Sequence, residues 1–302
     1  MGVYSVVSWF LCFLGVVLLY LMVAFFVLLE RKLLGVSQLR LGPNKVSVWG
    51  LFQSFADFIK LLAKHGLFGV GGFLVVYRGF FFMLGVLFFL VCSLVFCFLF
   101  LYSGLGVGCG FFLCWLVVVS CLSGYGFILC GWGSDSKYAL YGSLRSSFCS
   151  VSFEGILVCL MLIFGCFYYS YSSSFVLFVD WSTSISFFGC YFVSLICFLF
   201  ECNRSPFDYS ESESDLVSGF NTDFFGISFA ILFASEYCLV ILFAWLLGFF
   251  FWSYLGLWVF FFHTFIFIWV RACFPRLRYD YFVVFVWQHF FVYFFFVLLF
   301  FL

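Results

Sequence analysis

Two glutamates, Glu154 and Glu236, stand inside long apolar runs of the sequence. A charged carboxylate at the centre of a bilayer costs roughly 2.5 kcal/mol or more, so such residues normally face a bundle interior or water. Burial and a neighbouring carboxylate both favour the protonated form of a carboxyl group, which allows it to exchange protons. We interpret both residues as proton-relay groups. The alternative is a helix–helix hydrogen bond made by a permanently protonated glutamate.

More acids lie close together between positions 201 and 223, where Arg204 is the single base. These acids are Glu201, Asp208, Glu211, Glu213, Asp215 and Asp223. Like charges at this density repel one another unless some are protonated or paired. We interpret the segment as an acidic funnel that passes protons toward the membrane axis, and the alternative is a solvated acidic loop. A related hypothesis is that Arg31 and Arg40 pair with part of it.

The rest of the chain is suited to holding these acids in a bilayer. Of its 302 residues, 67% are hydrophobic and 9% are charged, whereas a soluble domain carries about 25% charged residues. Apolar runs of the roughly 20 residues needed to cross a bilayer lie near 4–29, 74–102, 109–131, 148–170, 183–201, 226–248, 251–271 and 282–302. The sequence therefore predicts an all-α integral membrane protein with about eight transmembrane helices in a single polytopic domain, 1–302.

All lysines and arginines fall on one side of this arrangement, in or beside the loops that follow odd-numbered helices. The loops of the other side, around 103–108, 171–182 and 249–250, contain none. The positive-inside rule predicts that the basic loops face the matrix or the cytoplasm.

The first basic loop is long, and its segment 50–62 alternates apolar and polar residues at helical spacing. Its apolar members are Leu51, Phe52, Phe55, Phe58, Ile59 and Leu62. This pattern predicts an amphipathic helix at the membrane interface, between the first two spanning helices. The segment 136–147 is expected to be a short polar connector.

The fifteen cysteines show no Cys-x-x-Cys spacing and lie mostly in apolar runs, and the three histidines are far apart. Buried cysteine behaves as a small hydrophobic residue. We therefore expect no metal ion, iron–sulfur cluster or disulfide in this chain.

Four polar stretches of the basic side carry a resemblance to a known family. They read ERKLLGVSQLRLGPN from Glu30, SKYALYGSLRSSFCSVSFE from Ser136, FECNRSPFDYSESESDLVSGF from Phe200, and WVRACFPRLRYD from Trp269. In order and nearly residue for residue, they resemble the matrix-side loops of the subunit 1 family of respiratory NADH:ubiquinone oxidoreductase (complex I). The resemblance covers essentially the whole chain.

The resemblance implies a core membrane subunit that forms a quinone-binding channel and couples quinone reduction to proton translocation. It assigns the channel and its opening to Arg31, Gln38, Arg40, Asp57, Phe220, Arg271, Arg276 and Arg278. It assigns proton coupling to Glu154, Glu201, Asp208, Glu211, Glu213 and Glu236.

The family also implies the chemistry of the surrounding assembly. Ubiquinone is the substrate, and FMN and iron–sulfur clusters lie in partner subunits of the peripheral arm, next to further membrane subunits. This chain is expected to bind no cofactor and no nucleic acid, and to have no activity in isolation. The expected location is the mitochondrial inner membrane. A composition rich in Phe, Cys, Gly and Trp and poor in Pro and His indicates a gene with T- and G-rich codons, which suggests that the organelle encodes it.

Two positions depart from the family pattern. His65 follows Lys64 where the family usually has an acid, and His263 is the ionisable side chain inside the seventh expected helix, where a lysine is frequent.

Other functions remain open from the residues alone. An ion transporter would explain intramembrane acids, but the sequence has no internal repeat or paired Gly/Pro-broken helices. The homologous membrane subunit of an energy-converting hydrogenase is a nearer alternative. A purely structural anchor has no need of buried acids.

Overall fold

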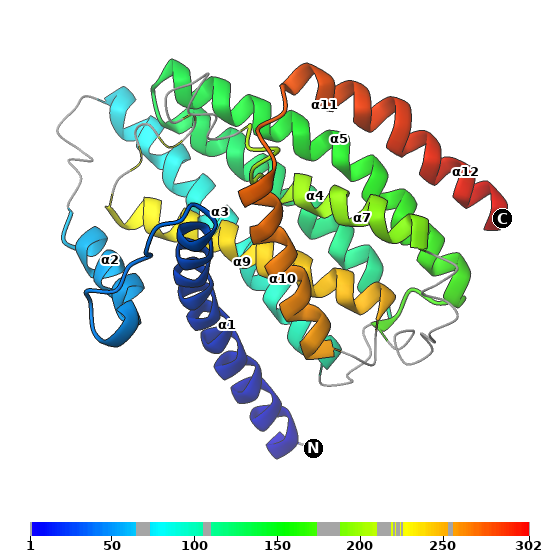
Figure 1. Cartoon of the computed structure of the whole chain (residues 1–302), viewed down its shortest axis with the longest axis horizontal. Coiled ribbons are helices and arrows are strands. Elements are labelled where there is room, and N and C mark those ends of the chain that lie inside the picture. The colour runs from blue at the N-terminus through cyan, green and yellow to red at the C-terminus, as the bar shows by residue number, and fades with distance from the viewer. Residues whose placement is uncertain are drawn as a thin grey trace.

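The computed structural model describes residues 2–64, 73–104, 110–173, 188–209, 219, 221, 224, 226–252 and 256–301. Within these ranges the chain is helical and contains no β-strand (Figure 1). The elements are α1 (Gly2–Ser37), η1 (Val48–Gly50), α2 (Gln53–Leu62), α3 (Phe73–Gly104), α4 (Phe112–Gly133), α5 (Lys137–Tyr168), α7 (Phe188–Glu201), α9 (Gly226–Phe251), α10 (Gly256–Cys273), α11 (Tyr279–Phe285), η5 (Val286–Phe290) and α12 (Phe291–Phe301).

Six helical segments of the described chain are long and apolar enough to cross a membrane. They are 10–37, 79–103, 112–133, 137–168, 226–251 and 279–299, the last comprising α11, η5 and α12. Two shorter apolar helices, 188–201 and 258–273, lie within α7 and α10. The predicted fold class, an all-α membrane protein with about eight spanning helices, is confirmed.

The expected polar connector at 136–147 is wrong, because α5 begins at Lys137 and continues to Tyr168. Ser136 caps its first turn by accepting a hydrogen bond from the Ala139 amide. The serines of the following turns, such as Ser143 and Ser147, donate to the carbonyl three residues earlier. A serine that satisfies its own hydroxyl in this way is tolerated inside a helix, so the polar composition did not mark a loop.

The predicted amphipathic helix is present as α2, shorter at its start than the segment 50–62. Gly50 ends the preceding η1 turn with φ +71°, and a side chain there would collide with the Pro43 carbonyl, so the position requires glycine. Helix α2 packs against α1 and α9, with Phe55 edge-on to Phe25 of α1 at 6.3 Å between ring centroids. The amphipathic segment therefore covers the end of α1 nearest the basic loop.

Helix α9 is the central element of the bundle. It is the most buried of the six long apolar segments, and it contacts α1, α2, α3, α7 and α10 (Figure 1). Helices α3, α4 and α5 form a second layer in chain order, where Gly85 and Gly133 let neighbouring backbones approach closely. A polar residue on α9 is thus surrounded by protein on most sides.

Helices α11 and α12, joined by the π-helical turn η5, run along the outer edge of the bundle beside α5 (Figure 1). Their buried face consists of Phe282, Val286, Phe290 and Phe294. A strict spacing of four drifts by about 40° per step around an α-helix of 3.6 residues per turn. The wider turn of η5 keeps Val286 and Phe290 on the same inner face.

Candidate functional site

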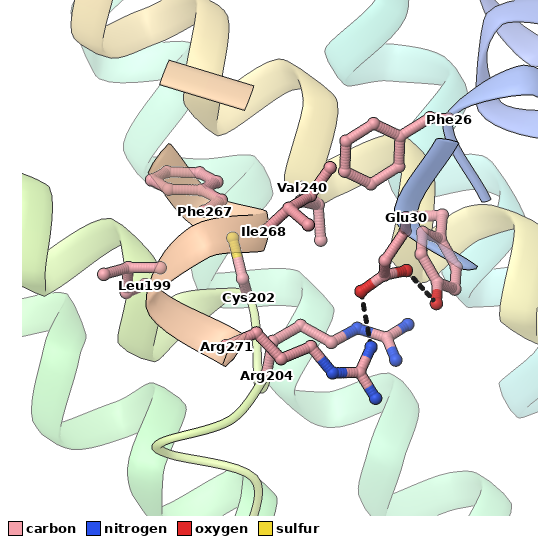
Figure 2. Close-up of a pocket in the computed structure, with 10 residues that line it drawn as sticks. Phe26, Glu30, Leu199, Cys202, Arg204, Val240, Phe267, Ile268 and Arg271 are labelled. Carbon is pink, nitrogen blue, oxygen red and sulfur yellow. Dashed lines mark hydrogen bonds and ion pairs between the residues drawn. The ribbon is translucent and has the colours of Figure 1, made fainter. Parts of the chain in front are cut away.

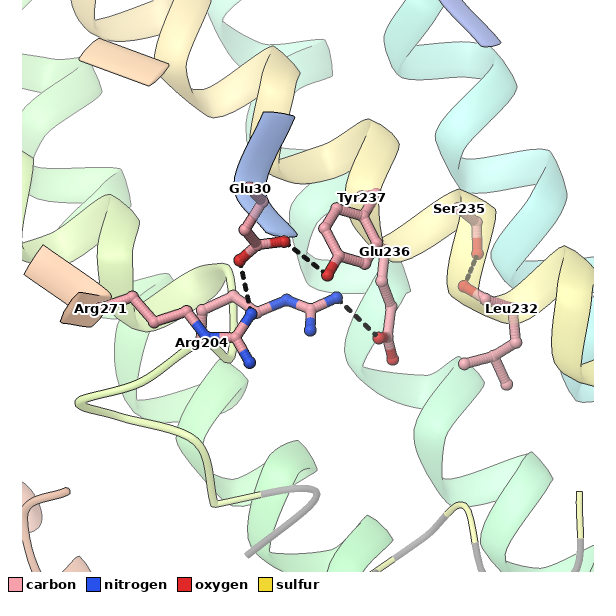
Figure 3. A network of polar contacts seen from close by, with 7 residues as sticks. All are labelled: Glu30, Arg204, Leu232, Ser235, Glu236, Tyr237 and Arg271. Carbon is pink, nitrogen blue, oxygen red and sulfur yellow. Dashed lines mark hydrogen bonds and ion pairs between the residues drawn. The ribbon is translucent and has the colours of Figure 1, made fainter. Parts of the chain in front are cut away.

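The carboxylate of Glu30 joins three helices near the basic end of the bundle. Glu30 lies about two turns before the end of α1, and its side chain is 7% exposed. Arg271 of α10 donates from Nη1 to Oε1 at 2.5 Å (Figure 2), and the Tyr237 hydroxyl of α9 donates to Oε2 at 2.7 Å (Figure 3). Both carboxylate oxygens therefore have a donor, which is what a buried charge requires.

A second ion pair lies beside the first. Arg204, in the turn after α7, faces Glu236 of α9 with 3.7 Å between Nη2 and Oε2, and the two side chains are 11% and 12% exposed. Its guanidinium also lies 4.0 Å from the centre of the Tyr237 ring (Figure 3), a cation–π contact. Tyr237 thus contacts one pair through its hydroxyl and the other through its ring.

We call these five residues the Glu30 network: Glu30, Arg271, Tyr237, Arg204 and Glu236. Its two acids and two guanidinium groups balance in charge. Four of its members line a small pocket with apolar walls from α1, α7, α9 and α10, including Phe26, Leu199 and Ile268 (Figure 2). The network therefore places fixed charges next to an apolar surface inside the bundle.

A different pair of acids lies between α4, α5 and α7. Glu154 of α5 lies near the thiol of Cys121 on α4, and its Oε1 atom is buried without a hydrogen-bond partner. Glu201 at the end of α7 is close enough to interact electrostatically with Glu154. Neither carboxylate forms an ion pair with a residue that the structure describes. We call Glu154 and Glu201 the acid pair.

Because α5 begins at Lys137, Glu154 lies near the middle of its helix. The span expected near 148–170 would have placed it close to the helix start. The serine-rich turns before it are buried, among them Ser143, Ser146 and Ser150. The residues that precede Glu154 are therefore buried turns of the same helix and not a polar loop.

Asp208 ties two polar segments of the basic side together. Its side chain is 9% exposed and accepts from Arg276 Nη2 at 3.1 Å. The Leu277 amide donates to the Pro206 carbonyl at 3.0 Å. The segments after α7 and after α10 are thus joined by one ion pair and one backbone hydrogen bond.

The cations of the first loop have other partners than those hypothesised. Arg31 forms an ion pair with Asp57 of α2 at 2.6 Å, and Gln53 donates to the other Asp57 oxygen at 3.0 Å. Arg40 Nε donates to the Gln38 side chain at 2.8 Å. In the described part of the segment 201–223, it is Arg276 that meets Asp208. The loop pairs are local because α2 folds back onto the end of α1.

The remaining predicted site residues are either exposed or not described. Arg278 pairs with Asp280 at 2.8 Å on the surface. Phe220, Glu211, Glu213 and His65 lie outside the described residues. Among the predicted site residues, the structure places Arg271 and Glu236 in one network and Glu154 near Glu201. Others lie at the periphery: Arg31, Gln38, Arg40, Asp57 and Arg278.

Three network members were not among the predicted site residues: Glu30, Arg204 and Tyr237. Signals for two of them were present in the sequence. Glu30 is an acid at the end of the first apolar run, and Arg204 is the only base of an acidic segment. Tyr237 carries no comparable signal, because tyrosine occurs 17 times in the chain.

His263 is fully enclosed between α10 and α7. Its Nδ1 lies 2.7 Å from the Val259 carbonyl, and its Nε2 lies 2.9 Å from the Tyr191 hydroxyl. A carbonyl only accepts, so Nδ1 carries the proton and Nε2 accepts from the tyrosine. Among the described histidines, cysteines and acids, no group of three could hold a metal ion.

The sequence is similar to known proteins over nearly its whole length. The pattern of the family described as NADH dehydrogenase matches residues 10–302. The chain is 40% identical over 287 residues to NADH-ubiquinone oxidoreductase chain 1 of Heterololigo bleekeri, covering 89% of this chain and 88% of that relative.

Two insect proteins with the same name are similar to nearly the same extent. The relative from Apis mellifera ligustica is 36% identical, and the aligned region covers 87% of this chain and 87% of that relative. The relative from Anopheles gambiae is 37% identical, and the aligned region covers 89% of this chain and 86% of that relative.

Proposed function

The chain belongs to the NADH dehydrogenase family, as a relative of NADH-ubiquinone oxidoreductase chain 1, and from this premise we propose that it forms the quinone channel of the complex and couples quinone reduction to proton translocation. It is a membrane subunit of NADH:ubiquinone oxidoreductase, that is, of respiratory complex I. The enzyme activity belongs to the assembly. The proposal concerns which part of that reaction this chain performs.

The observation that carries the proposal is the presence of four carboxylates in the bundle in two different electrostatic settings. Glu30 and Glu236 are held by guanidinium groups in the Glu30 network. Glu154 and Glu201 lie close enough to interact electrostatically, and neither forms an ion pair with a described residue. Buried acids are costly in a membrane and are found where ions or protons move, so an arrangement with both kinds supports a coupling role.

Arg204 and Glu201 provide the connection between the two settings. They are three residues apart at the end of α7, so the same turn contributes to the network and to the acid pair. A change of charge near Glu30 or Arg271 alters the field at Arg204, and through this turn it alters the proton affinity of Glu201. In this mechanism the network senses quinone chemistry and the acid pair, with Asp208, Glu211 and Glu213, accepts and releases the proton.

We assign the channel to the region around α1, α2, α9 and α10. The small network pocket, whose apolar walls come from α1, α7, α9 and α10, lies beside this region with Arg271 at its edge. Apolar walls with a polar group suit a hydrophobic ligand that has a polar headgroup. Arg31, Gln38, Arg40 and Asp57 lie around α2 and are assigned to the channel opening. We also assign to the channel, on the side that faces the partner subunits, Phe220, Arg276 and Arg278.

The proposed surroundings follow from the family. The basic loops face the matrix of the mitochondrial inner membrane, where peripheral-arm subunits with FMN and iron–sulfur clusters contact this face. Ubiquinone is the substrate, and other membrane subunits flank the bundle.

The test is purification of the native chain from its membrane, followed by NADH:quinone reductase assays with and without a channel-blocking quinone analogue. Co-migration with a large NADH-oxidising complex that the analogue inhibits supports the proposal. Protection of the network pocket from photolabelling by a quinone probe, when excess ubiquinone is present, tests the channel assignment. Isolation with a hydrogenase or transport activity instead would overturn it.

A further inference from the structure

The last spanning segment carries two polar side chains at the middle of its length, Gln288 and His289. The segment runs from Tyr279 to Leu299. At about 1.5 Å of rise per residue, Gln288 lies roughly 15 Å from either end. The hydrocarbon core of a bilayer is about 30 Å thick, so this residue is at the mid-depth of the membrane.

Both side chains are exposed and point away from the bundle. The inner face is formed by Val286 and Phe290 on either side of them, which are 1% and 6% exposed. The π-helical turn η5 keeps those two residues on the inner face, and Gln288 and His289 therefore project together from the outer face.

Neither side chain has a hydrogen-bond partner among the residues that the structure describes. The His289 ring lies tilted against the Phe285 ring, at 5.3 Å between centroids. Several polar side chains of the described spans bond within the bundle, such as Tyr20 with Ser93 at 2.8 Å and Tyr191 with His263 at 2.9 Å. Gln288 and His289 have no such partner and face outward, so any partner they have lies outside the described bundle.

Lipid tails cannot satisfy these groups. A glutamine amide has two donors and an acceptor oxygen, and the hydrocarbon region offers no partner for either. The side chain is also too short to reach the headgroup region from mid-depth, as a long lysine or arginine does from a helix end. A partner at the same depth must come from another polypeptide.

We propose that the outer face of α11, η5 and α12 around Gln288 and His289 binds a transmembrane helix of another subunit, which presents a hydrogen-bonding side chain at mid-depth. Apolar side chains along the same face, Phe285, Val292 and Phe296, are 44%, 42% and 66% exposed and supply the packing surface. A polar contact within an apolar helix–helix seam fixes the register of the two helices. This inference rests on the membership of the chain in a multi-subunit complex.

The test uses the whole complex in its native membrane, with a photoreactive phenylalanine analogue placed at position 288. The expected result is an adduct with one membrane polypeptide, identified by its peptide mass. An adduct with lipid or quinone alone, or no polypeptide adduct, would overturn the inference. In that event the complex still co-purifies with this chain, whereas failure of co-purification would count against the proposed function itself.

A matched pair of variants gives an independent readout. Gln288→Leu removes the hydrogen bond and leaves a side chain of similar size on the proposed face. Val118→Leu changes an exposed apolar position of α4 outside that face. We expect Gln288→Leu to lower the fraction of complex that keeps the cross-linked subunit in stringent detergent by several-fold, with Val118→Leu unchanged. If Gln288→Leu retains that subunit as well as the unmodified complex does, the polar contact does not exist.

Discussion

The Glu30 network and the acid pair place carboxylates in the same bundle but treat their charge in opposite ways. In the network, each acid meets a guanidinium group, and Tyr237 contacts both pairs. In the acid pair, Glu154 and Glu201 lie near each other and near the Cys121 thiol. Each carboxylate of the network thus faces an opposite charge, whereas in the acid pair two like charges lie near each other, and binding a proton reduces that repulsion.

This difference suggests two roles for the buried acids: charge compensation in the network and proton exchange in the acid pair. A compensated pair is sensitive to the loss of one partner, because a buried charge is left behind. A proton-sharing pair is sensitive to replacements that remove its ability to titrate, even when they keep its shape. Variants that distinguish charge loss from titration loss therefore test the comparison.

The largest effect is expected when one partner of the network is removed. Glu30→Ala leaves Arg271 without its partner carboxylate, which costs about 3–5 kcal/mol for a buried pair. We expect little or no assembled complex on native gels. The double variant Glu30→Gln with Arg271→Met removes both charges, so assembly should recover. Normal assembly of Glu30→Ala would show that Glu30 is not held as an ion.

The acid pair should behave in the opposite way. Glu201→Gln keeps the shape of the side chain and removes its titration, so we expect normal assembly and a fall of at least about tenfold in coupled quinone reduction, or about 1.4 kcal/mol. Glu154→Gln added to it should change little, since the two acids act as one unit. Cys121→Ser, which changes a small side chain near Glu154 and keeps both acids, is the control. Full activity of Glu201→Gln would end the proton-sharing interpretation.

A smaller effect is expected from the residue that joins the two halves of the network. Tyr237→Phe loses a hydrogen bond to a charged acceptor, worth about 1.5–3 kcal/mol, and keeps the ring against Arg204. The complex should assemble but inactivate at a lower temperature. Tyr20→Phe removes a hydroxyl bonded to Ser93 away from the network, and its loss should be smaller because both groups are neutral. Equal shifts for the two variants would remove any special role for Tyr237.

The smallest effect is expected at the exposed pair of the first loop. Arg31 and Asp57 are 47% and 38% exposed, and a surface ion pair is worth about 0–1 kcal/mol. Arg31→Met should shift the inactivation temperature less than Tyr237→Phe does, and added salt should remove the difference. A shift larger than that of Tyr237→Phe would place Arg31 in a buried interface of the assembly.

Local patterns in the sequence were sufficient for the architecture and for part of the site. Apolar length predicted the spanning helices, and the spacing of residues such as Phe55, Phe58 and Ile59 predicted an amphipathic helix that is present as α2. Glu154 and Glu236 were recognisable because an acid in an apolar run is expensive wherever it packs. The start of α5 was mispredicted because serines that bond to their own helix look like a polar loop.

The sequence by itself determined that this chain is an all-α membrane protein and that some of its helices carry buried acids. These properties depend on the transfer of residues from water to lipid, which is a property of local composition. Only the tertiary structure decided which acid meets a cation and which meets another acid. Glu30 and Arg271 are 241 residues apart in the chain, and Tyr237 joins them to Arg204 across a third helix. Such partnerships follow from how the helices pack, because electrostatic energy depends on distances of a few ångströms that no local pattern encodes.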